Sequence, residues 1–217
     1  MNERPIRFGI LASGRGSNAD ALMSAFSTGQ IPGAEVTVVI ANRSDAGVLE
    51  RAKNRGVEAL VIPSAERSRH DHEMAMLEAL GERRVDHLLL AGYMRVLSRT
   101  FLRGWRGSIL NIHPSLLPEF PGLHAQRRQW DAGVRVAGAT VHYVDDGVDT
   151  GPVLLQGSID VRGDEGAERL SERILEEVEH VIYPRAVRLF LERQQRATAR
   201  KEPGETDPGA ASAGLPG

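Results

Sequence analysis

The stretch IRFGILASGRGSN, residues 6–18, joins an apolar run to a glycine-containing turn. Its first part, residues 6–13, is apolar at nearly every position, which is typical of a strand buried on both faces of a sheet. The turn leads directly into residues 18–28, whose apolar side chains recur at helical spacing. A buried strand, a tight turn and a helix in this order predict an α/β fold.

The same alternation of short apolar runs and helical stretches continues through the first half of the chain. Further strands are predicted at residues 35–41, 58–62, 86–92 and 108–113, and further helices at residues 46–55 and 70–84. Because these strands lack a polar face, helices should cover both sides of the sheet. We therefore expect a Rossmann-like, doubly wound and mostly parallel sheet flanked by helices.

The pattern changes in the second half of the chain. SLLPEFPGLH, residues 115–124, is a loop rich in proline and glycine, and residues 136–144 form another predicted strand. Residues 152–160 should extend the sheet with an antiparallel edge. The apolar period of residues 168–195 predicts a long closing helix, which Pro184 should kink or divide.

The length of 217 residues fits one domain with a single core. We expect this domain over residues 1–196, with two halves over about residues 1–105 and about residues 106–196. Residues 197–217 contain too few large apolar side chains to offset the entropy of ordering, so we expect a disordered tail there.

The composition narrows the class of protein. No apolar run approaches the roughly 20 residues that span a bilayer, and the N-terminus lacks a signal-peptide pattern, so we expect a cytoplasmic protein without membrane contact. With no cysteine, the chain has no disulfide and no thiolate nucleophile. Its net charge of −2 argues against a broad nucleic-acid surface.

SGRGSN, residues 13–18, lies where the first strand meets the first helix. Glycines there allow close approach of a ligand, and free amides at the positive end of the helix favour a phosphate. The alternative is a plain turn in which Ser17 or Asn18 caps the helix. The stretch is not a dinucleotide-binding GxGxxG motif, because no third glycine follows.

NIHPSLLP, residues 111–118, and DDGVDTGP, residues 145–152, each follow a predicted strand. Strand period directs Asn111 and His113 to the same side, where both could donate hydrogen bonds to an oxyanion. A carboxylate beside His113, for which we choose Asp149, would favour the imidazolium. The alternatives are that the amide and imidazole satisfy loop backbone and that the acidic residues form a solvated turn.

Other polar patterns point to no metal site. His70 and His72 are too close in sequence to form an i, i+4 zinc pair. Residues 177–184 are typical of an amphipathic helix with solvated glutamates and His180 near its end.

The combination of NIHPSLLPEFPGLHAQ with DDGVDTGPV resembles the glycinamide ribonucleotide formyltransferase family, over about residues 6–184. The resemblance implies transfer of a formyl group from 10-formyltetrahydrofolate to the amine of glycinamide ribonucleotide, without a metal. It implies a phosphate-binding first half and a catalytic, folate-binding second half. The catalytic residues that it implies are Asn111, His113 and Asp149.

The resemblance also implies residues that bind the two substrates. Gly16, Ser17 and Asn18 would hold the substrate phosphate, and Glu179 the ribose. The folate would be contacted by Arg69, at its carboxylate tail, and by Met94, Arg95, Val96, Leu97, Asp145, Asp146, Gly147 and Val148.

One departure from the family's spacing concerns the closing helix. Between Arg173 and the pair Glu179-His180 this chain carries one residue more than is usual in the family. A single insertion turns a regular helix by about 100°. Glu177 is therefore an alternative ligand for the ribose.

Related activities compete with this interpretation. Methionyl-tRNA formyltransferase needs a second, basic domain, and formyltetrahydrofolate deformylase normally carries an additional N-terminal domain. A catalytically inactive nucleotide-binding module or a dinucleotide-dependent oxidoreductase is disfavoured, by the intact trio and the missing third glycine respectively. The sequence does not decide between a monomer and a homodimer, and it indicates no nucleic-acid partner.

Overall fold

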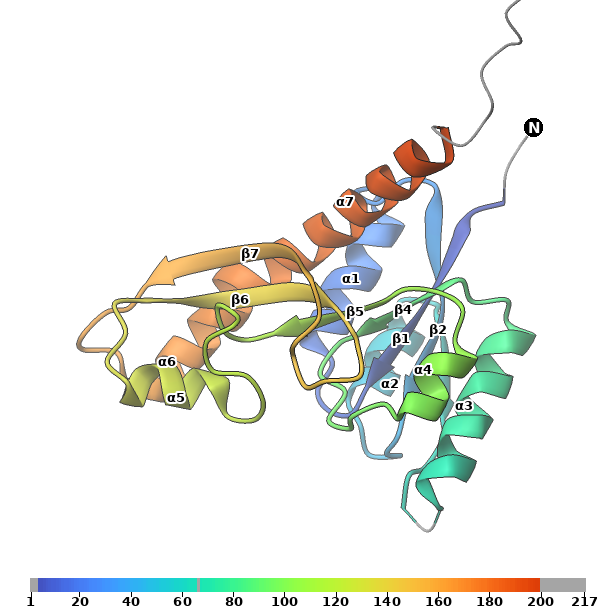
Figure 1. The fold of residues 1–217 in the computed structure, drawn as a ribbon, viewed down its shortest axis with the longest axis horizontal. Helices are drawn as coiled ribbons and strands as arrows, with labels where there is room; N and C mark the ends of the chain where they lie inside the picture. The colour runs from blue at the N-terminus through green and yellow to red at the C-terminus, as the bar shows by residue number, and fades with distance from the viewer. Residues whose placement is uncertain (1–3, 66, 200–217) are drawn as a thin grey trace, which may run out of the picture.

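A seven-stranded sheet forms the centre of the computed structural model over the residues that it describes, 4–65 and 67–199 (Figure 1). The strand order is β3-β2-β1-β4-β5-β6-β7. The strands are β1 (Ile6–Ala12), β2 (Ala34–Ala41), β3 (Glu58–Val61), β4 (His87–Leu90), β5 (Ile109–His113), β6 (Val136–Tyr143) and β7 (Val153–Asp160). β1 to β5 pair in parallel with one another, whereas β6 pairs antiparallel with β5 and β7 antiparallel with β6. The Rossmann-like sheet with an antiparallel edge is confirmed.

Helices connect the strands and cover both faces of the sheet. They are α1 (Ser17–Ser27), α2 (Val48–Asn54), α3 (Arg69–Glu82), α4 (Arg99–Gly104), α5 (Ala125–Asp131), α6 (Gly166–Arg173), the π-helix η1 (Ile174–Glu179) and α7 (His180–Ala199). The sequence did not predict α4 and α5, because six or seven residues are too few to display a helical period. None of the described helices is long and apolar enough to cross a membrane.

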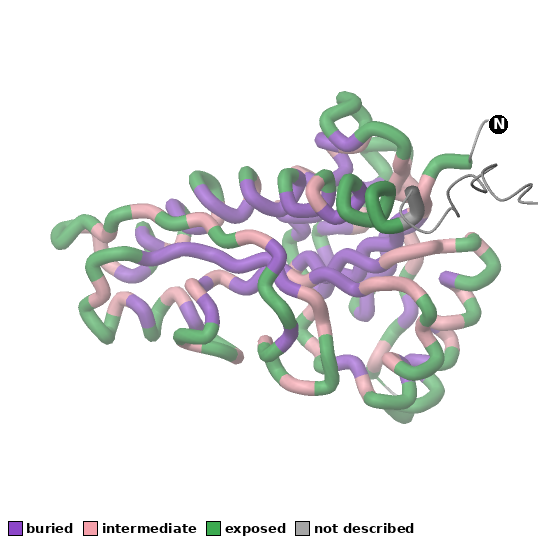
Figure 2. Tube along the Cα trace, turned by 45° about the horizontal axis from the view of Figure 1, so that its top comes forward, coloured by how far each residue is buried: buried purple, intermediate pink, exposed green. Residues whose placement is uncertain are grey.

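The core has two parts, one on each face of the sheet. Leu22 of α1 and Tyr183 and Phe190 of α7 belong to the larger part, and Met76 of α3 and Phe101 of α4 belong to the smaller. Figure 2 shows the buried strands between these layers. Because both faces are covered, the central strands are apolar along most of their length, as residues 6–13 indicated.

The closing helix is divided, but not at Pro184 as expected. Pro184 lies inside α7, and the interruption is the π-helix η1, which comes before it. The His180 amide donates to the Leu175 carbonyl five residues back, the spacing of a π-helix. Proline is tolerated because the bond that it cannot form would reach His180, the first residue of α7.

The end of α7 differs slightly from the expected boundary at residue 196. The helix continues to Ala199. The remainder of the predicted disordered tail, residues 200–217, lies outside the described residues.

Two histidines lie in or beside the core, His72 buried and His87 half-buried. His72 is 1% exposed, and its Nε2 lies 3.0 Å from the Ile62 carbonyl oxygen. The Nδ1 atom of His87 accepts a hydrogen bond of 3.0 Å from the Ser108 amide, and its ring meets Phe190 edge-on. Burial lowers the pKa of His72 and that of His87 below the ordinary value.

We expect the free energy of unfolding to fall as the pH is lowered from about 7.5 to about 5.5. Burial lowers the pKa of four histidines, so the unfolded chain binds protons in this range that the folded chain does not: His72, His87, His113 and His180. Glu179, whose pKa burial raises, opposes this trend as a single group. Urea unfolding at several pH values measures the slope.

The variant His72→Leu is the matched control for this slope. It removes one of the four histidines, and His72 lies outside the candidate site. Its stability should depend less steeply on pH than that of the wild type. A wild-type stability that is constant or increases toward pH 5.5 would contradict the expected proton linkage.

Candidate active site

Asn111 and His113 lie at the carboxyl end of β5, and Asp149 reaches them from the loop that follows β6. The Asn111 Nδ2 atom is 3.5 Å from Asp149 Oδ1, and the His113 Nδ1 atom is 3.2 Å from Asp149 Oδ2. The structure therefore brings the three predicted catalytic side chains together. Ligands of open α/β sheets bind at this edge.

The Asp149 carboxylate joins two loops. Its Oδ2 accepts a hydrogen bond of 2.8 Å from the Gly122 amide, in the loop after β5. Asp149 itself has a φ of 56°, a left-handed conformation that is strained for a residue other than glycine. Burial raises the pKa of Asp149, but the donors around its carboxylate, among them the Gly122 amide, hold it below its ordinary value. Asp149 is thus ionised at neutral pH.

Asp149 favours the His113 imidazolium as expected, but burial has a larger, opposite effect. Burial lowers the pKa of His113, and the opposing effects of the Phe120 carbonyl and Asp149 do not restore it. The Nε2 atom lies 2.9 Å from the Phe120 oxygen, so both ring nitrogens face acceptors. A neutral ring can donate to only one of them at a time.

The loop after β5 is held by buried polar side chains of neighbouring elements. Thr140, opposite His113 on β6, donates to the Ser115 carbonyl at 2.6 Å and accepts from the Leu117 amide at 3.0 Å. Gln129 of α5 donates to the Pro114 carbonyl at 2.7 Å. These bonds satisfy backbone groups that proline and burial would otherwise leave unpaired.

His142 belongs to the same cluster, although the sequence did not single it out. It lies opposite Asn111 in the β5–β6 pairing, and its Nε2 is 3.1 Å from Asn111 Nδ2. The signal that could have revealed it is the antiparallel register, which a single sequence does not supply.

At the SGRGSN turn, Gly16 is the residue that precedes α1, and no side chain caps the helix. The first intrahelical bond is donated by the Asp20 amide to the Gly16 carbonyl, so the amides of Ser17, Asn18 and Ala19 precede it. Ser17 and Asn18 are therefore not caps. The uncapped N-terminus of this helix, which is 11 residues long, suits an anion.

The need for glycine at position 16 has a second cause. Gly16 has a φ of 77°, and a Cβ there would lie 2.5 Å from the Cβ of Val48 in α2. Close packing of two helices therefore excludes a side chain, in addition to any close approach of a ligand.

Glu179 is directed into the protein, toward α1. It is 5% exposed, and its Oε2 accepts a hydrogen bond of 2.5 Å from Asn18 Nδ2. Burial raises the pKa of Glu179, and the bond from Asn18 offsets this in part. Glu177, the alternative, is instead paired with Arg173 at 2.9 Å and is half exposed.

The π-helix explains how Glu179 keeps this direction despite the additional residue. A π turn takes up one residue more than an α turn, so the helix on either side can remain in register. Arg173, before η1, is buried against Glu165, and Glu179, at its end, is buried against Asn18. An additional residue in a regular helix would rotate the residues that follow it by about 100°. The wider π turn avoids this rotation.

The predicted folate residues of the loop after β4 differ in exposure. Arg69 of α3 donates to the Val96 carbonyl, and it pairs with Glu73 at 3.3 Å. Met94 and Val96 are 69% and 55% exposed, whereas Leu97 is 6% exposed and packs in the core beneath α3 and α4. Because the Leu97 side chain is part of that core, Leu97 can face the exposed edge of this loop only with its backbone.

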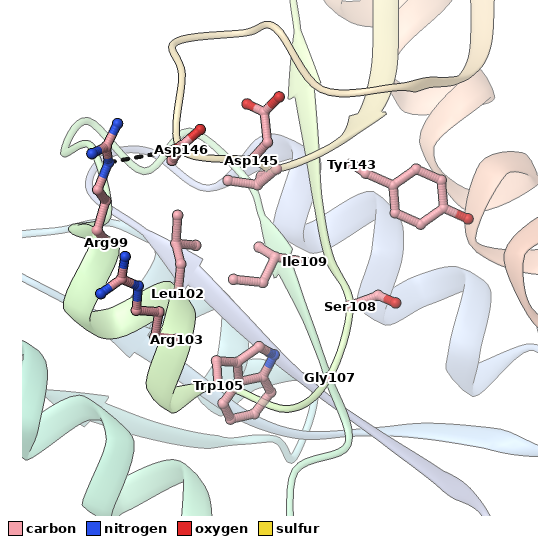
Figure 3. A pocket seen from close by; sticks show the side chains of 11 residues that line it. Arg99, Leu102, Arg103, Trp105, Gly107, Ser108, Ile109, Tyr143, Asp145 and Asp146 are labelled. Atoms are coloured by element: carbon pink, nitrogen blue, oxygen red, sulfur yellow. Dashed lines mark ion pairs between the residues drawn. The ribbon is translucent and has the colours of Figure 1, made fainter.

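Asp145 and Asp146 line a cavity of about 350 Å³ together with apolar side chains, among them Leu102, Trp105 and Ile109. Figure 3 shows the two carboxylates at one end of the cavity and the Trp105 ring at the other. Asp146 pairs with Arg99 at 3.1 Å. Residues 94–97 are not among the lining residues, so the predicted folate contacts form two groups.

The turn over residues 145–151 is tightly wound. Asp145 Oδ1 accepts hydrogen bonds from the Gly147 amide at 3.1 Å and from the Thr150 hydroxyl at 2.8 Å. Val148, in the same turn, is 50% exposed. In the described part of the chain, no group of three or more His, Asp or Glu side chains is arranged to hold a metal ion.

A Rossmann-like sheet that carries an amide, an imidazole and a largely buried carboxylate at its carboxyl edge can stabilise an oxyanion that forms at a carbonyl centre. The family model described as formyl transferase matches residues 6–187. The chain therefore belongs to the formyl transferase family.

Individual relatives agree with this assignment. The chain is 37% identical to the phosphoribosylglycinamide formyltransferase of Bacillus subtilis (strain 168), over 85% of this chain and 94% of that protein. It is 41% identical to the trifunctional purine biosynthetic protein adenosine-3 of Drosophila melanogaster, over 88% of this chain but only 14% of that protein. The crystal structure of glycinamide ribonucleotide transformylase 1 from Symbiobacterium toebii superposes with a TM-score of 0.84 and 48% identity, over 88% of this chain and 90% of that one.

Deletion of Glu176, an exposed residue within η1, should convert the π turn into a regular α turn. Arg173 and Glu179 should keep their buried partners, because the helix on either side stays in register. We expect the melting temperature to change by no more than about 3 °C, which corresponds to about 1 kcal/mol for a domain of this size.

Deletion of Arg188, an exposed residue of regular helix in α7, is the matched control. It should rotate Phe190 and Leu191 away from the core, because no wider turn absorbs the loss. A destabilisation of about 3 kcal/mol or more is expected, or roughly 10 °C in melting temperature. Equal losses for both deletions would refute the role assigned to η1.

Proposed function

We propose that this chain transfers the formyl group of 10-formyltetrahydrofolate to the amine of glycinamide ribonucleotide, giving N-formylglycinamide ribonucleotide and tetrahydrofolate in purine biosynthesis. The observation that carries the proposal is the convergence of Asn111 and His113 on Asp149 at the carboxyl edge of the sheet. The activities after which the B. subtilis and S. toebii proteins are named support the same reaction.

In this proposal the phosphate of the acceptor binds at the N-terminus of α1. The uncapped amides of Ser17 and Asn18 would donate to its oxygens, with Gly16 completing the turn. Glu179 would contact the ribose. The Asn18 side chain supports this role because it bonds to Glu179, and its Oδ1 is buried without a hydrogen-bond partner.

The folate would lie along the two exposed edges of the neighbouring loops. Its flat ring suits the cavity that Trp105 lines together with Asp145 and Asp146, and Gly147 and Val148 continue this edge. Met94, Arg95, Val96 and the backbone of Leu97 would form the opposite edge. Arg69, held beside Val96, would meet a carboxylate of the folate tail.

The chemistry follows from charges that develop during attack. The acceptor nitrogen forms a bond to the formyl carbon, and negative charge develops on the formyl oxygen, which Asn111 stabilises as a donor. The proton that the attacking amine loses is taken up by the Asp149–His113 pair, in which Asp149 opposes the effect of burial on the ring. The bond from carbon to N10 of the folate then breaks, and N10 receives the proton.

The proposal assigns both substrates to one domain over residues 1–196, with the phosphate in the first half and the folate in the second. It places the reaction in the cytoplasm. A homodimer would be compatible with it, since the three central side chains come from one chain.

The proposed activity is tested by following folate deformylation in the presence and absence of glycinamide ribonucleotide. We expect turnover that requires the acceptor. Asn111→Ala should lower kcat about 100- to 1,000-fold with little change in KM, because its hydrogen bond strengthens as the oxyanion forms. Asp149→Asn should keep folate binding and lose turnover, since the amide retains the shape without the charge.

The surface variant Arg127→Ala, which breaks only an exposed ion pair with Asp131, is the control and should retain wild-type kinetics. Turnover without the acceptor would indicate a deformylase. An absence of turnover with both substrates would indicate an inactive binding module, and near-normal kcat in Asn111→Ala would refute the assigned oxyanion donor.

A further inference from the structure

His142 is a buried side chain directly opposite Asn111. β5 and β6 pair antiparallel with Asn111 against His142, and side chains opposed in this way project from the same face. The pairing of β6 with β7 is irregular between Val141 and His142, and such irregularities redirect side chains near active sites. His142 is 2% exposed, so its ring is fixed by protein contacts.

The two ring nitrogens of His142 face groups of opposite kind. Nδ1 lies 2.8 Å from the Tyr143 carbonyl oxygen, which can only accept, so Nδ1 carries a proton and donates. Nε2 lies 3.1 Å from Asn111 Nδ2, which can only donate, so Nε2 accepts. A neutral imidazole with its proton on Nδ1 satisfies both contacts.

Asp149 is the competing partner of His142. Its Oδ1 lies 3.5 Å from Nε2, and only a protonated Nε2 could bond to it. The shorter distance to Asn111 favours the acceptor role of Nε2. Because the Tyr143 carbonyl already requires a proton on Nδ1, a bond from Nε2 to Asp149 would need a charged ring within the buried cluster.

The same contacts determine which way the Asn111 amide points. If the amide turned over, its oxygen would face both the Asp149 carboxylate and the lone pair of His142 Nε2. Nδ2 therefore points into the cluster. One of its two protons is bonded to His142, and the other faces Asp149 only across 3.5 Å, so it is available to a stronger acceptor.

We infer that His142 is a positioning residue for formyl transfer, whose Nε2 lone pair fixes the Asn111 amide so that its second N–H meets the developing oxyanion. The inference rests on the proposed function and deepens it, because it adds a residue that the resemblance did not supply. His142 touches neither substrate, and it acts through Asn111.

A double-mutant cycle tests this role. His142→Phe keeps the shape of the ring and removes the acceptor, so kcat should fall about 10- to 100-fold while both KM values change less than about threefold. His142→Gln, whose Oε1 can accept from Nδ2, should recover most of that loss. In an Asn111→Ala background, His142→Phe should have no further effect on kcat. Equal effects in both backgrounds, or a loss confined to KM, would overturn the inference.

A second measurement is independent of turnover. Long-range ¹H–¹⁵N correlation spectra of the ¹⁵N-histidine-labelled wild type should show the proton of His142 on Nδ1, and Asn111→Ala should shift its Nε2 resonance. A proton on Nε2 would overturn the inference. If the wild type shows the expected tautomer but transfers no formyl group, the proposed function fails, and with it the catalytic role of His142, whereas the amide orientation stands.

Discussion

The antiparallel pairing of β6 with β5 is the constraint on which the site depends. β6 runs antiparallel to β5, so the residues of the two strands face each other in reverse order. This register sets His142 against Asn111 and Thr140 against His113. One strand thus supplies both the partner of the amide and the anchor of the loop after β5. The turn that carries Asp149 follows from the same reversal.

Burial determines the charge state of the cluster. Asp149 remains ionised because several donors surround it. His113 stays neutral because its hydrogen-bond and charge partners do not offset the desolvation of the ring. The site therefore holds one negative charge beside a ring that can accept a proton. Such an arrangement responds to charge that develops on a substrate, since electrostatic effects are large where water is excluded.

The sequence predicted the sheet and its helices well, because their apolar periods are long and are set by burial. It placed Asn111 and His113 on one face through strand period, and Asp149 beside them through an assumed turn. It predicted that Asp149 would raise the pKa of His113, but not that burial would outweigh this effect, since the depth of burial is a property of the packed molecule. His142 was missed because local sequence patterns do not give the register between two strands. Leu97 was assigned to a site through resemblance, but its side chain belongs to the core.

The π-helix at residues 174–179 has a consequence for how such chains change in length. A helix that accepts a residue by widening one turn can tolerate an insertion without disturbing the faces before and after it. Drift in length becomes nearly neutral at that point, even a few residues from a ligand. The number of residues between two positions then does not predict the relative directions of their side chains. Two homologues with different spacing can present the same carboxylate to the same partner.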